Sequence, residues 1–434
     1  MSAGRPFWYR FAWFLGRPPE LSSRQWRVLG LVAAVSFFET YDMFLFTLNL
    51  KQIQADLGVA EADLGLLGSL VRAGALFSLF IAVAADRVGR RRMLLITIVA
   101  YTLLTGLTAF SPNAETFVVL QFFARAFAVA ETILAMVVIV EEFPAEHRGW
   151  GVGAAGAIQA CGGGFAALLF GFVDVLPYGW RALYLVGLVP LMLVAYWRRT
   201  LPETERFKEL ATHQQERMGT NAFSPILELG RRYPRRFWAL AAAVFMTSVA
   251  TSSAGFFAPK YLQDAHGWSP ANIALMTLIG GAVAILGNPL AGWLSDTRGR
   301  RPITAIFACG VGVSAMLLYN ASGVLLPVFW IVFLFFQLGT GVTEGTYSAE
   351  MFPTSQRSTA AGARALTATL GAIVGLAGVS ALFPLVGSNW AAVSVLAGGC
   401  FVVPIIVLVF FPETARRALE DIAPDVPTKV DRSR

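Results

Sequence analysis

Two carboxylates interrupt the first long apolar stretch of the chain. Glu39 and Asp42 lie within "FFETYDMFLF" (37–46), inside an apolar run that extends from Leu29 to Leu50. Residues three apart share one face of a helix, so both acids look toward the same surroundings. Because a carboxylate is costly inside a membrane and needs a partner there, we predict that this pair forms part of a functional site.

Further ionisable residues lie at a comparable depth in neighbouring apolar stretches. At about 1.5 Å per helical residue, Arg72, Arg125 and Glu131 lie, like the two acids, about 15–24 Å from the predicted cytoplasmic ends of their helices. Arg72 is a candidate to neutralise an acid of the first helix. Two interpretations stay open: the group is a proton-coupling and substrate site, or it is a set of static ion pairs that hold the helices together.

One more acid, Glu344, lies in a later apolar stretch, about 9 Å from Glu350 at its predicted cytoplasmic end. It is equally consistent with a gate and with a substrate site. All three histidines, His147, His213 and His266, fall in predicted loops, so any proton carrier within the membrane must be a carboxylate.

The elements that position these residues are predicted to be membrane-spanning helices. The chain has 434 residues, of which 56% are hydrophobic and only 14% charged, well below the charged fraction of ordinary soluble domains. Helices satisfy their own backbone groups in lipid, and no alternating pattern typical of barrel strands occurs. The twelve predicted spans are 27–50, 63–85, 93–112, 115–140, 149–172, 181–198, 237–259, 270–294, 302–320, 324–348, 358–383 and 389–411.

Internal repeats indicate two halves of one plan. The stretch "ADRVGRR" (85–91) recurs as "SDTRGRR" (295–301), "EEFPAEHR" (141–148) as "EMFPTSQR" (350–357), and "LPETER" (201–206) as "FPETAR" (411–416). Six spans per half give both halves the same orientation in the membrane. The expected organisation is an N-terminal interfacial segment (1–26), a six-helix bundle (27–199), a cytoplasmic linker (200–236), a second six-helix bundle (237–411) and a cytoplasmic tail (412–434).

The placement of basic residues predicts the topology. The net charge is +7, but among the predicted external loops only Lys51, Arg181 and Lys260 are basic. Basic residues concentrate on the cytoplasmic side of membrane proteins, so both termini are expected to be cytoplasmic in a bacterial inner membrane. This distribution argues against a nucleic-acid partner.

These motifs resemble those of the major facilitator superfamily, and within it the sugar porter and metabolite:proton symporter branch. The resemblance implies an all-α membrane protein with twelve transmembrane helices in two six-helix bundles. It also implies an ion-pair network that latches one state of the transport cycle, whereas positive-inside topology with incidental pairs is the alternative. The latch residues implied are Asp86, Arg90, Arg91, Glu141 and Arg148 in the first half, and Asp296, Arg300, Arg301, Glu350 and Arg357 in the second.

The first helix also resembles that of aromatic-acid:proton symporters, in which the pattern is D-G-[YF]-D. Here "ETYD" (39–42) has Glu in place of the first Asp and Thr40 in place of Gly. The resemblance implies that Asp42 or Glu39 carries the proton and that Arg125 contacts a substrate anion.

The sequence therefore predicts a monomeric secondary transporter that moves a small organic metabolite, expected to be an anion, together with protons by alternating access. A uniporter or exporter of neutral or drug-like compounds is the alternative, followed by a non-transporting membrane receptor. No nucleotide-binding loop, zinc spacing or nucleophile with a base partner occurs, so neither an enzyme nor a cofactor or metal is expected. The expected partners are the substrate, protons and the lipid bilayer.

Overall fold

The computed structural model describes residues 6–10, 12–88, 90–144, 146–198, 224–417 and 422–423. All regular elements in these ranges are helical. Eleven helices, counting joined segments as one, are long and apolar enough to cross a membrane, and α4 is apolar over the shorter stretch Arg92–Thr108. Together they correspond to the twelve predicted spans.

The first half contains α1 (Ser23–Leu48), α2 (Leu50–Leu57), α3 (Leu64–Val88), α4 (Arg90–Thr108), α5 (Ala114–Glu142), α6 (Arg148–Phe170) and α7 (Trp180–Arg198). The second half contains α9 (Ser224–Arg232), α10 (Pro234–His266), α11 (Pro270–Ala284), α12 (Gly287–Arg298), α13 (Arg300–Asn320), α14 (Leu325–Glu350), α15 (Arg357–Val386), α16 (Asn389–Gly398) and α17 (Val402–Phe410). Short 3₁₀ turns are η1 (Phe7–Arg10), η2 (Trp13–Leu15), η3 (Glu61–Asp63), η5 (Thr354–Gln356) and η6 (Gly399–Phe401).

The chain folds into two compact units, and three helices have residues in both. Unit 1 comprises Met1–Glu61, Leu70–Thr220 and Leu262–Leu278, and unit 2 comprises Ala62–Ser69, Asn221–Tyr261 and Ile279–Arg434. The helices α3, α10 and α11 cross between these ranges. The domain boundaries expected from the sequence stay a prediction.

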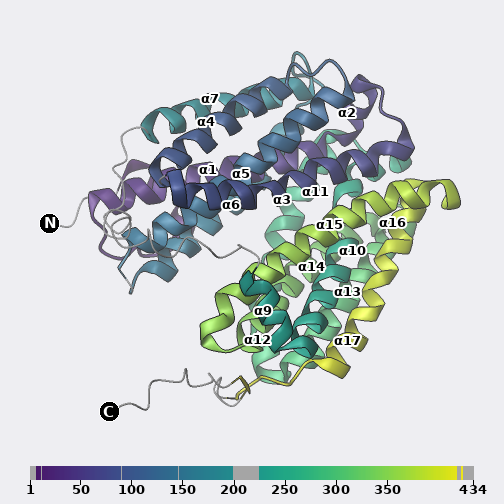
Figure 1. Cartoon of the computed structure of the whole chain (residues 1–434). Helices are drawn as coiled ribbons and strands as arrows, with labels where there is room; N and C mark the ends of the chain where they lie inside the picture. The colour runs from purple at the N-terminus through teal and green to yellow at the C-terminus, as the bar shows by residue number, and fades with distance from the viewer. Residues whose placement is uncertain are drawn as a thin grey trace, which may run out of the picture. The chain divides into compact units, whose positions relative to one another are not determined.

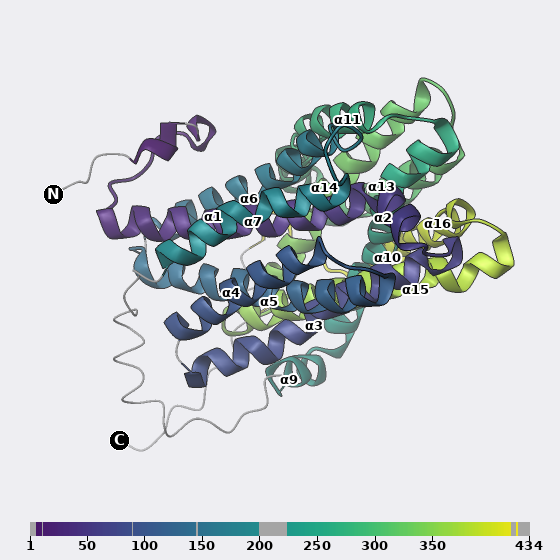
Figure 2. The ribbon, with the colours of Figure 1, turned by 90° about the horizontal axis from the view of Figure 1, so that it is seen from above.

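In unit 1, α1 packs along α6 and also contacts α5 and α7, while α4 packs against α5 and α7 (Figures 1 and 2). Local sequence signals begin these helices: Ser22 and Gln25 form a reciprocal capping box at the start of α1, and Asn113 caps α5. The approach of α1 to α6 is very close, because a Cβ at Gly162 would lie 2.0 Å from the Phe37 carbonyl oxygen. Small residues in α6 therefore allow the contact, as its glycine-rich sequence predicts.

In unit 2, α13 lies at the centre and contacts α12, α14, α16 and α17, while α15 packs against α14 and α16. Two spans are interrupted. The break between α11 and α12 directly precedes "GNPL" (287–290), because Pro289 lacks the N–H that would continue the ladder. The other interruption is η6, which joins α16 to α17.

Lys260 corrects the loop assignment made from sequence. It lies inside α10 and is only 1% exposed, with its ammonium 5.9 Å from the centre of the Trp390 ring. The other two basic residues assigned to external loops, Lys51 and Arg181, agree with that assignment. Lys51 pairs with Asp264 at 2.9 Å and Arg181 with Asp56 at 2.9 Å, all within unit 1.

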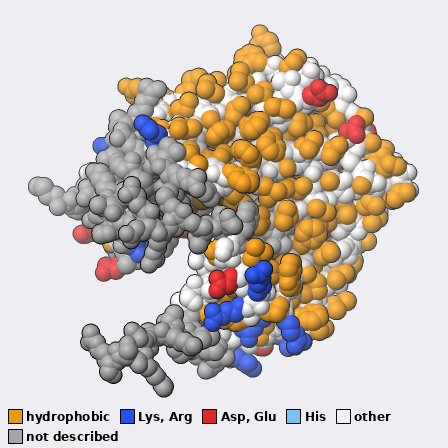
Figure 3. All heavy atoms as spheres, in the orientation of Figure 1, with side chains coloured by type: hydrophobic (Ala, Val, Ile, Leu, Met, Phe, Trp, Pro, Cys, Tyr) orange, Lys and Arg blue, Asp and Glu red, His pale blue; other side chains and the backbone are white. Residues whose placement is uncertain are grey.

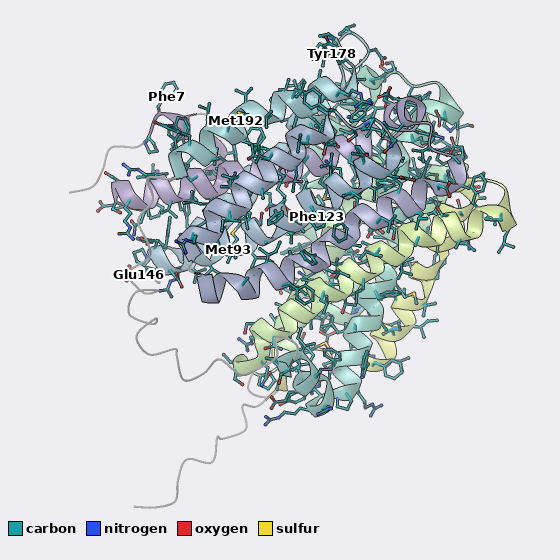
Figure 4. The ribbon with its side chains drawn as sticks, turned by 45° about the horizontal axis from the view of Figure 1, so that its top comes forward. Phe7, Met93, Phe123, Glu146, Tyr178 and Met192 are labelled. Carbon is teal, nitrogen blue, oxygen red and sulfur yellow. The ribbon has the colours of Figure 1, made fainter. Side chains whose placement is uncertain are left out.

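The surface suits a lipid environment. On the face drawn in Figure 3, apolar side chains cover much of the helices, whereas Lys and Arg side chains gather where α9 and α12 lie in Figure 1. Phe7, before α1, and Tyr178, between α6 and α7, project from unit 1 and are 70% and 82% exposed (Figure 4). Aromatic side chains of this kind are enriched at membrane interfaces.

Candidate functional site

The first acid of the opening motif belongs to an ion pair. Arg125 of α5 donates from Nη1 to Glu39 Oε1 at 3.2 Å, and Thr132, seven residues later in α5, donates to Glu39 Oε2. Both oxygens of Glu39 are therefore occupied by α5. The sequence offered Arg72 as the partner for an acid of α1, and the structure places Arg125 there instead.

The second acid has different surroundings. Asp42 is 7% exposed and receives hydrogen bonds from two α4 hydroxyls, Tyr101 and Thr105, the latter at 3.0 Å. Both bonds reach the same oxygen, Oδ2, while Oδ1 is buried without a hydrogen-bond partner among the described residues. Asp42 thus lacks the direct ion pair that Glu39 has.

A line of hydroxyl groups on α4 organises this region. Thr97, Tyr101, Thr105 and Thr108, which we call the hydroxyl stripe, are spaced four, four and three residues apart and are at most 1% exposed. Such spacing puts them on one helical face. Thr97 donates a hydrogen bond to Glu131, and Tyr101 and Thr105 both donate to Asp42. Thr108 accepts a hydrogen bond from Gln121 at 3.1 Å. Scanning the sequence for charged residues alone missed this stripe, although its spacing was visible in "TIVAYTLLTGLT".

Arg72 of α3 is the cation of this region that has no acid bound to it. No ion pair or hydrogen bond joins its side chain to a described residue, and the main charged group acting on it is the like-charged Arg125. Arg72 is half-buried, so its guanidinium is available to an anion. We call the guanidinium groups of Arg72 and Arg125 and the carboxylates of Glu39 and Asp42 the charged core of unit 1.

The other two predicted acids have other hydrogen-bond surroundings. Glu131 is fully buried and accepts a hydrogen bond from Thr97 of α4. Glu344 belongs to unit 2, where it is 5% exposed and its Oε1 has no hydrogen-bond partner among the described residues. The charged group acting on Glu344 is Arg364 of α15.

An ordered ion-pair network lies at one end of unit 2. Arg300, at the start of α13, binds Glu350 of α14 through two parallel hydrogen bonds of 2.6 and 2.7 Å and also pairs with Asp296 at 2.7 Å. Thr414 donates to Glu350 at 2.7 Å, which ties the segment after α17 to the same carboxylate. The structure thus brings together Asp296, Arg300 and Glu350.

Glu413 extends this network as a cap on α13. Its carboxylate accepts the backbone N–H groups of Arg300 at 2.8 Å and Arg301 at 3.1 Å, which are free at a helix N-terminus. Burial alone would raise the pKa of Glu413, but hydrogen bonds from the surrounding backbone N–H groups outweigh it and hold that pKa below its usual value. In contrast, Arg357 forms no ion pair with a described residue.

The corresponding end of unit 1 is described only in part. Asp86, Arg90 and Arg91 lie outside the residues whose side chains are described. Arg148 donates to the Phe143 carbonyl at 3.1 Å. Glu141 is half-buried, and its neighbour Glu142, which the sequence did not single out, pairs with Arg24 of α1 at 2.5 Å.

Comparison with known proteins agrees with a two-half helical membrane fold of this kind. Residues 32–349 match the profile of the Major Facilitator Superfamily, and the chain belongs to this family. Among its relatives is a cis,cis-muconate transport protein of Acinetobacter baylyi, 28% identical over 364 residues, which cover 82% of this chain and 87% of that protein. A benzoate transport protein of the same organism is 24% identical over 394 residues, covering 82% and 83%.

A solved structure supports the fold. The crystal structure of a D-xylose-proton symporter superposes with a TM-score of 0.74 at 18% identity, covering 90% of this chain and 99% of that one. The protein is a multi-pass membrane protein and a secondary transporter of small organic compounds, and it is not an enzyme.

Proposed function

We propose that the protein is a proton-coupled symporter of small organic anions, with the charged core of unit 1 as its coupling site. The observation that carries the proposal is the charge balance of that core. Arg72 and Arg125 supply two positive charges, Glu39 supplies one negative charge, and Asp42 supplies a second only when it is ionised. When Asp42 is protonated, one positive charge is left over, and a monocarboxylate restores neutrality.

Asp42 is the better proton carrier of the two α1 acids. Glu39 is held by Arg125 and Thr132, so it fits the static ion pair that the sequence left open. Asp42 has opposing influences: burial favours its neutral form, whereas two hydroxyl donors favour its ionised form. A carboxyl group in which these influences oppose each other can exchange a proton during a transport cycle.

Arg72 is the guanidinium proposed to contact the substrate carboxylate. Arg125 was expected in that role from family resemblance, but its Nη1 already donates to Glu39. Two relatives are named for the transport of muconate and benzoate, both of which are carboxylates at neutral pH. An anionic substrate for this chain is in keeping with both names. The single surplus cation matches benzoate, which has one carboxylate, better than muconate, which has two.

The same proposal covers topology and the conformational latch. We expect a monomer in the bacterial inner membrane with both termini in the cytoplasm, since the exposed basic residues of α9 and α12 lie at the predicted cytoplasmic end. The network of Asp296, Arg300 and Glu350 would hold one state of an alternating-access cycle together and separate in another.

Uptake into proteoliposomes tests the proposal. Radiolabelled benzoate, muconate, a hexose and a cationic dye are offered to the wild type, Asp42→Asn and the control Asp174→Asn, which alters an exposed acid between α6 and α7. We expect an inward proton gradient to accelerate acid uptake by the wild type and the control, but not by Asp42→Asn. If the wild type takes up acids equally fast without a gradient, the protein is not a proton symporter.

A further inference from the structure

Tyr101 occupies a position between two acceptors. Its hydroxyl lies within hydrogen-bond distance of Asp42 Oδ2 and, at 3.0 Å, of the Phe38 backbone carbonyl oxygen. Phe38 lies four residues before Asp42, so its carbonyl faces the helical turn of α1 that carries the acid. Tyr101 is only 1% exposed, so water has little access to replace either bond.

A tyrosine hydroxyl has one hydrogen and can donate to only one of these oxygens at a time. When Asp42 is ionised, the carboxylate is the stronger acceptor and takes that hydrogen. When Oδ2 carries a proton, its O–H can donate to the Tyr101 oxygen, and the tyrosine hydrogen is then free for Phe38. No covalent bond to Tyr101 breaks, because the proton added to Asp42 comes from solvent and returns there.

We propose that Tyr101 is a positioning residue that converts the protonation state of Asp42 into a change of hydrogen bonding between α4 and the backbone of α1. The ionised state has a Tyr101 to Asp42 bond. The protonated state has an Asp42 to Tyr101 to Phe38 chain, which adds a tie between the two helices. This role rests on the proposed function, since Asp42 is taken there as the proton carrier.

The other groups around Asp42 do not form a comparable pair of hydrogen bonds to Asp42 and to the backbone of α1. Glu39 and Arg125 act on Asp42 electrostatically, and both are engaged with each other. Thr105 donates to the same Oδ2 at 3.0 Å, but it has no second bond to α1. Two tyrosines on α1 and α7 are also close enough to interact with the charge: Tyr41 donates to the Leu183 carbonyl at 2.7 Å, and Tyr184 has a buried hydroxyl without a described partner.

Infrared difference spectroscopy tests this role in the full-length protein reconstituted in lipid vesicles. The pH is varied while the carboxylic-acid C=O band and the tyrosine ring C–O band are followed. We expect both bands to change with one midpoint in the wild type and both changes to vanish in Asp42→Asn. In Tyr101→Phe the tyrosine change should vanish, and the carboxyl midpoint should rise by about one pH unit, because the ionised acid loses a hydrogen-bond donor.

Two variants serve as matched controls. Tyr184→Phe removes a tyrosine hydroxyl that is equally buried but has no hydrogen-bond partner among the described residues, so both bands and the midpoint should stay as in the wild type. Thr105→Val removes the other donor to Oδ2, so the carboxyl midpoint should rise while the tyrosine change persists. A merely structural Tyr101 would give no tyrosine signal that depends on Asp42.

The outcomes separate this role from the proposed function. A tyrosine change that survives in Tyr101→Phe or in Asp42→Asn, or an unshifted carboxyl midpoint in Tyr101→Phe, overturns the role of Tyr101. Absence of any Asp42 carboxyl band at every pH overturns it as well. If the bands change together but wild-type uptake ignores the proton gradient, Tyr101 responds to Asp42 as described and the symport proposal fails.

Discussion

At the residue scale, Glu39 and Asp42 show that two similar acids of one helix can have different surroundings. They share one face of α1, yet α5 supplies a cation and a hydroxyl to Glu39, whereas α4 supplies only hydroxyls to Asp42. An acid with an ion pair keeps its charge more readily than a buried acid with neutral donors. The difference therefore comes from the neighbouring helices and not from the motif itself.

The two arginines of the charged core should respond differently to substitution. Arg125→Gln leaves Glu39 buried without its cation, so we expect a loss of about 3–5 kcal/mol in the free energy of unfolding. Arg72→Gln strands no acid and should change stability by less than about 1 kcal/mol, while raising the substrate KM at least tenfold through the lost contact with the anion. Thermal unfolding in detergent and uptake kinetics measure the two effects.

A double substitution provides the control for the comparison of Arg125→Gln with Arg72→Gln. Glu39→Gln combined with Arg125→Gln removes both charges together and should recover much of the stability lost in Arg125→Gln alone. An Arg72→Gln protein that unfolds as easily as Arg125→Gln would contradict the assignment of the ion pair.

The sequence predicted these residues better than their partners. Intramembrane charge identified the acids and arginines, since lipid makes such residues costly. The choice of Arg125 over Arg72 as partner of Glu39 depends on how α3 and α5 are rotated about their axes, which spacing along one helix cannot give. The hydroxyl stripe is neutral and was overlooked, although its positions follow the helical period.

At the element scale, the contact between α1 and α6 sets where the acids of α1 lie. Gly162 and Gly163 are buried, and the backbone of α1 approaches Gly162 too closely for a side chain. The position of Glu39 and Asp42 relative to α4 and α5 thus depends on a small-residue face on the opposite side of α1.

We expect Gly162→Ala to destabilise the protein by about 1–3 kcal/mol, because the new methyl group meets a backbone oxygen that cannot move aside easily. Gly156→Ala in the same helix is the matched control, since a Cβ there has no neighbour within 4 Å. Its stability should stay equal or rise slightly, because Ala is the better helix former. Thermal unfolding of the Gly162→Ala and Gly156→Ala proteins measures the two effects. Equal destabilisation of both would argue against a backbone clash at Gly162.

Helix positions were the most predictable feature at this scale. Long apolar stretches bounded by polar or glycine-containing turns predicted the helical spans, although 270–294 was predicted as one span and is interrupted between α11 and α12. The burial of Lys260 was not predictable, because Trp390, whose ring lies near its ammonium group, comes from a distant part of the sequence.

At the scale of the whole molecule, the described residues of the two halves carry different groups of charged side chains. The first half contributes the charged core with Asp42 and Arg72, whereas the described part of the second half contributes an ordered network around Arg300 and Glu350. Internal repeats predicted that a helical unit occurs twice. They could not predict that intramembrane charge would concentrate in one copy, since that follows from residues outside the repeated motifs.

The charge balance of the core predicts that transport is electroneutral. One proton on Asp42 leaves one surplus positive charge, and one monocarboxylate neutralises it. Symport of a proton with a monocarboxylate carries no net charge, so it should follow the pH gradient and be insensitive to the membrane potential.

The most direct measurement is benzoate uptake into proteoliposomes in which the pH gradient and the membrane potential are set independently, the latter with a potassium gradient and valinomycin. For the wild type, we expect uptake driven by the pH gradient alone, with one proton entering per benzoate, and loss of this coupling in Asp42→Asn. Benzoate uptake driven equally well without a pH gradient, or unchanged coupling in Asp42→Asn, would contradict this expectation.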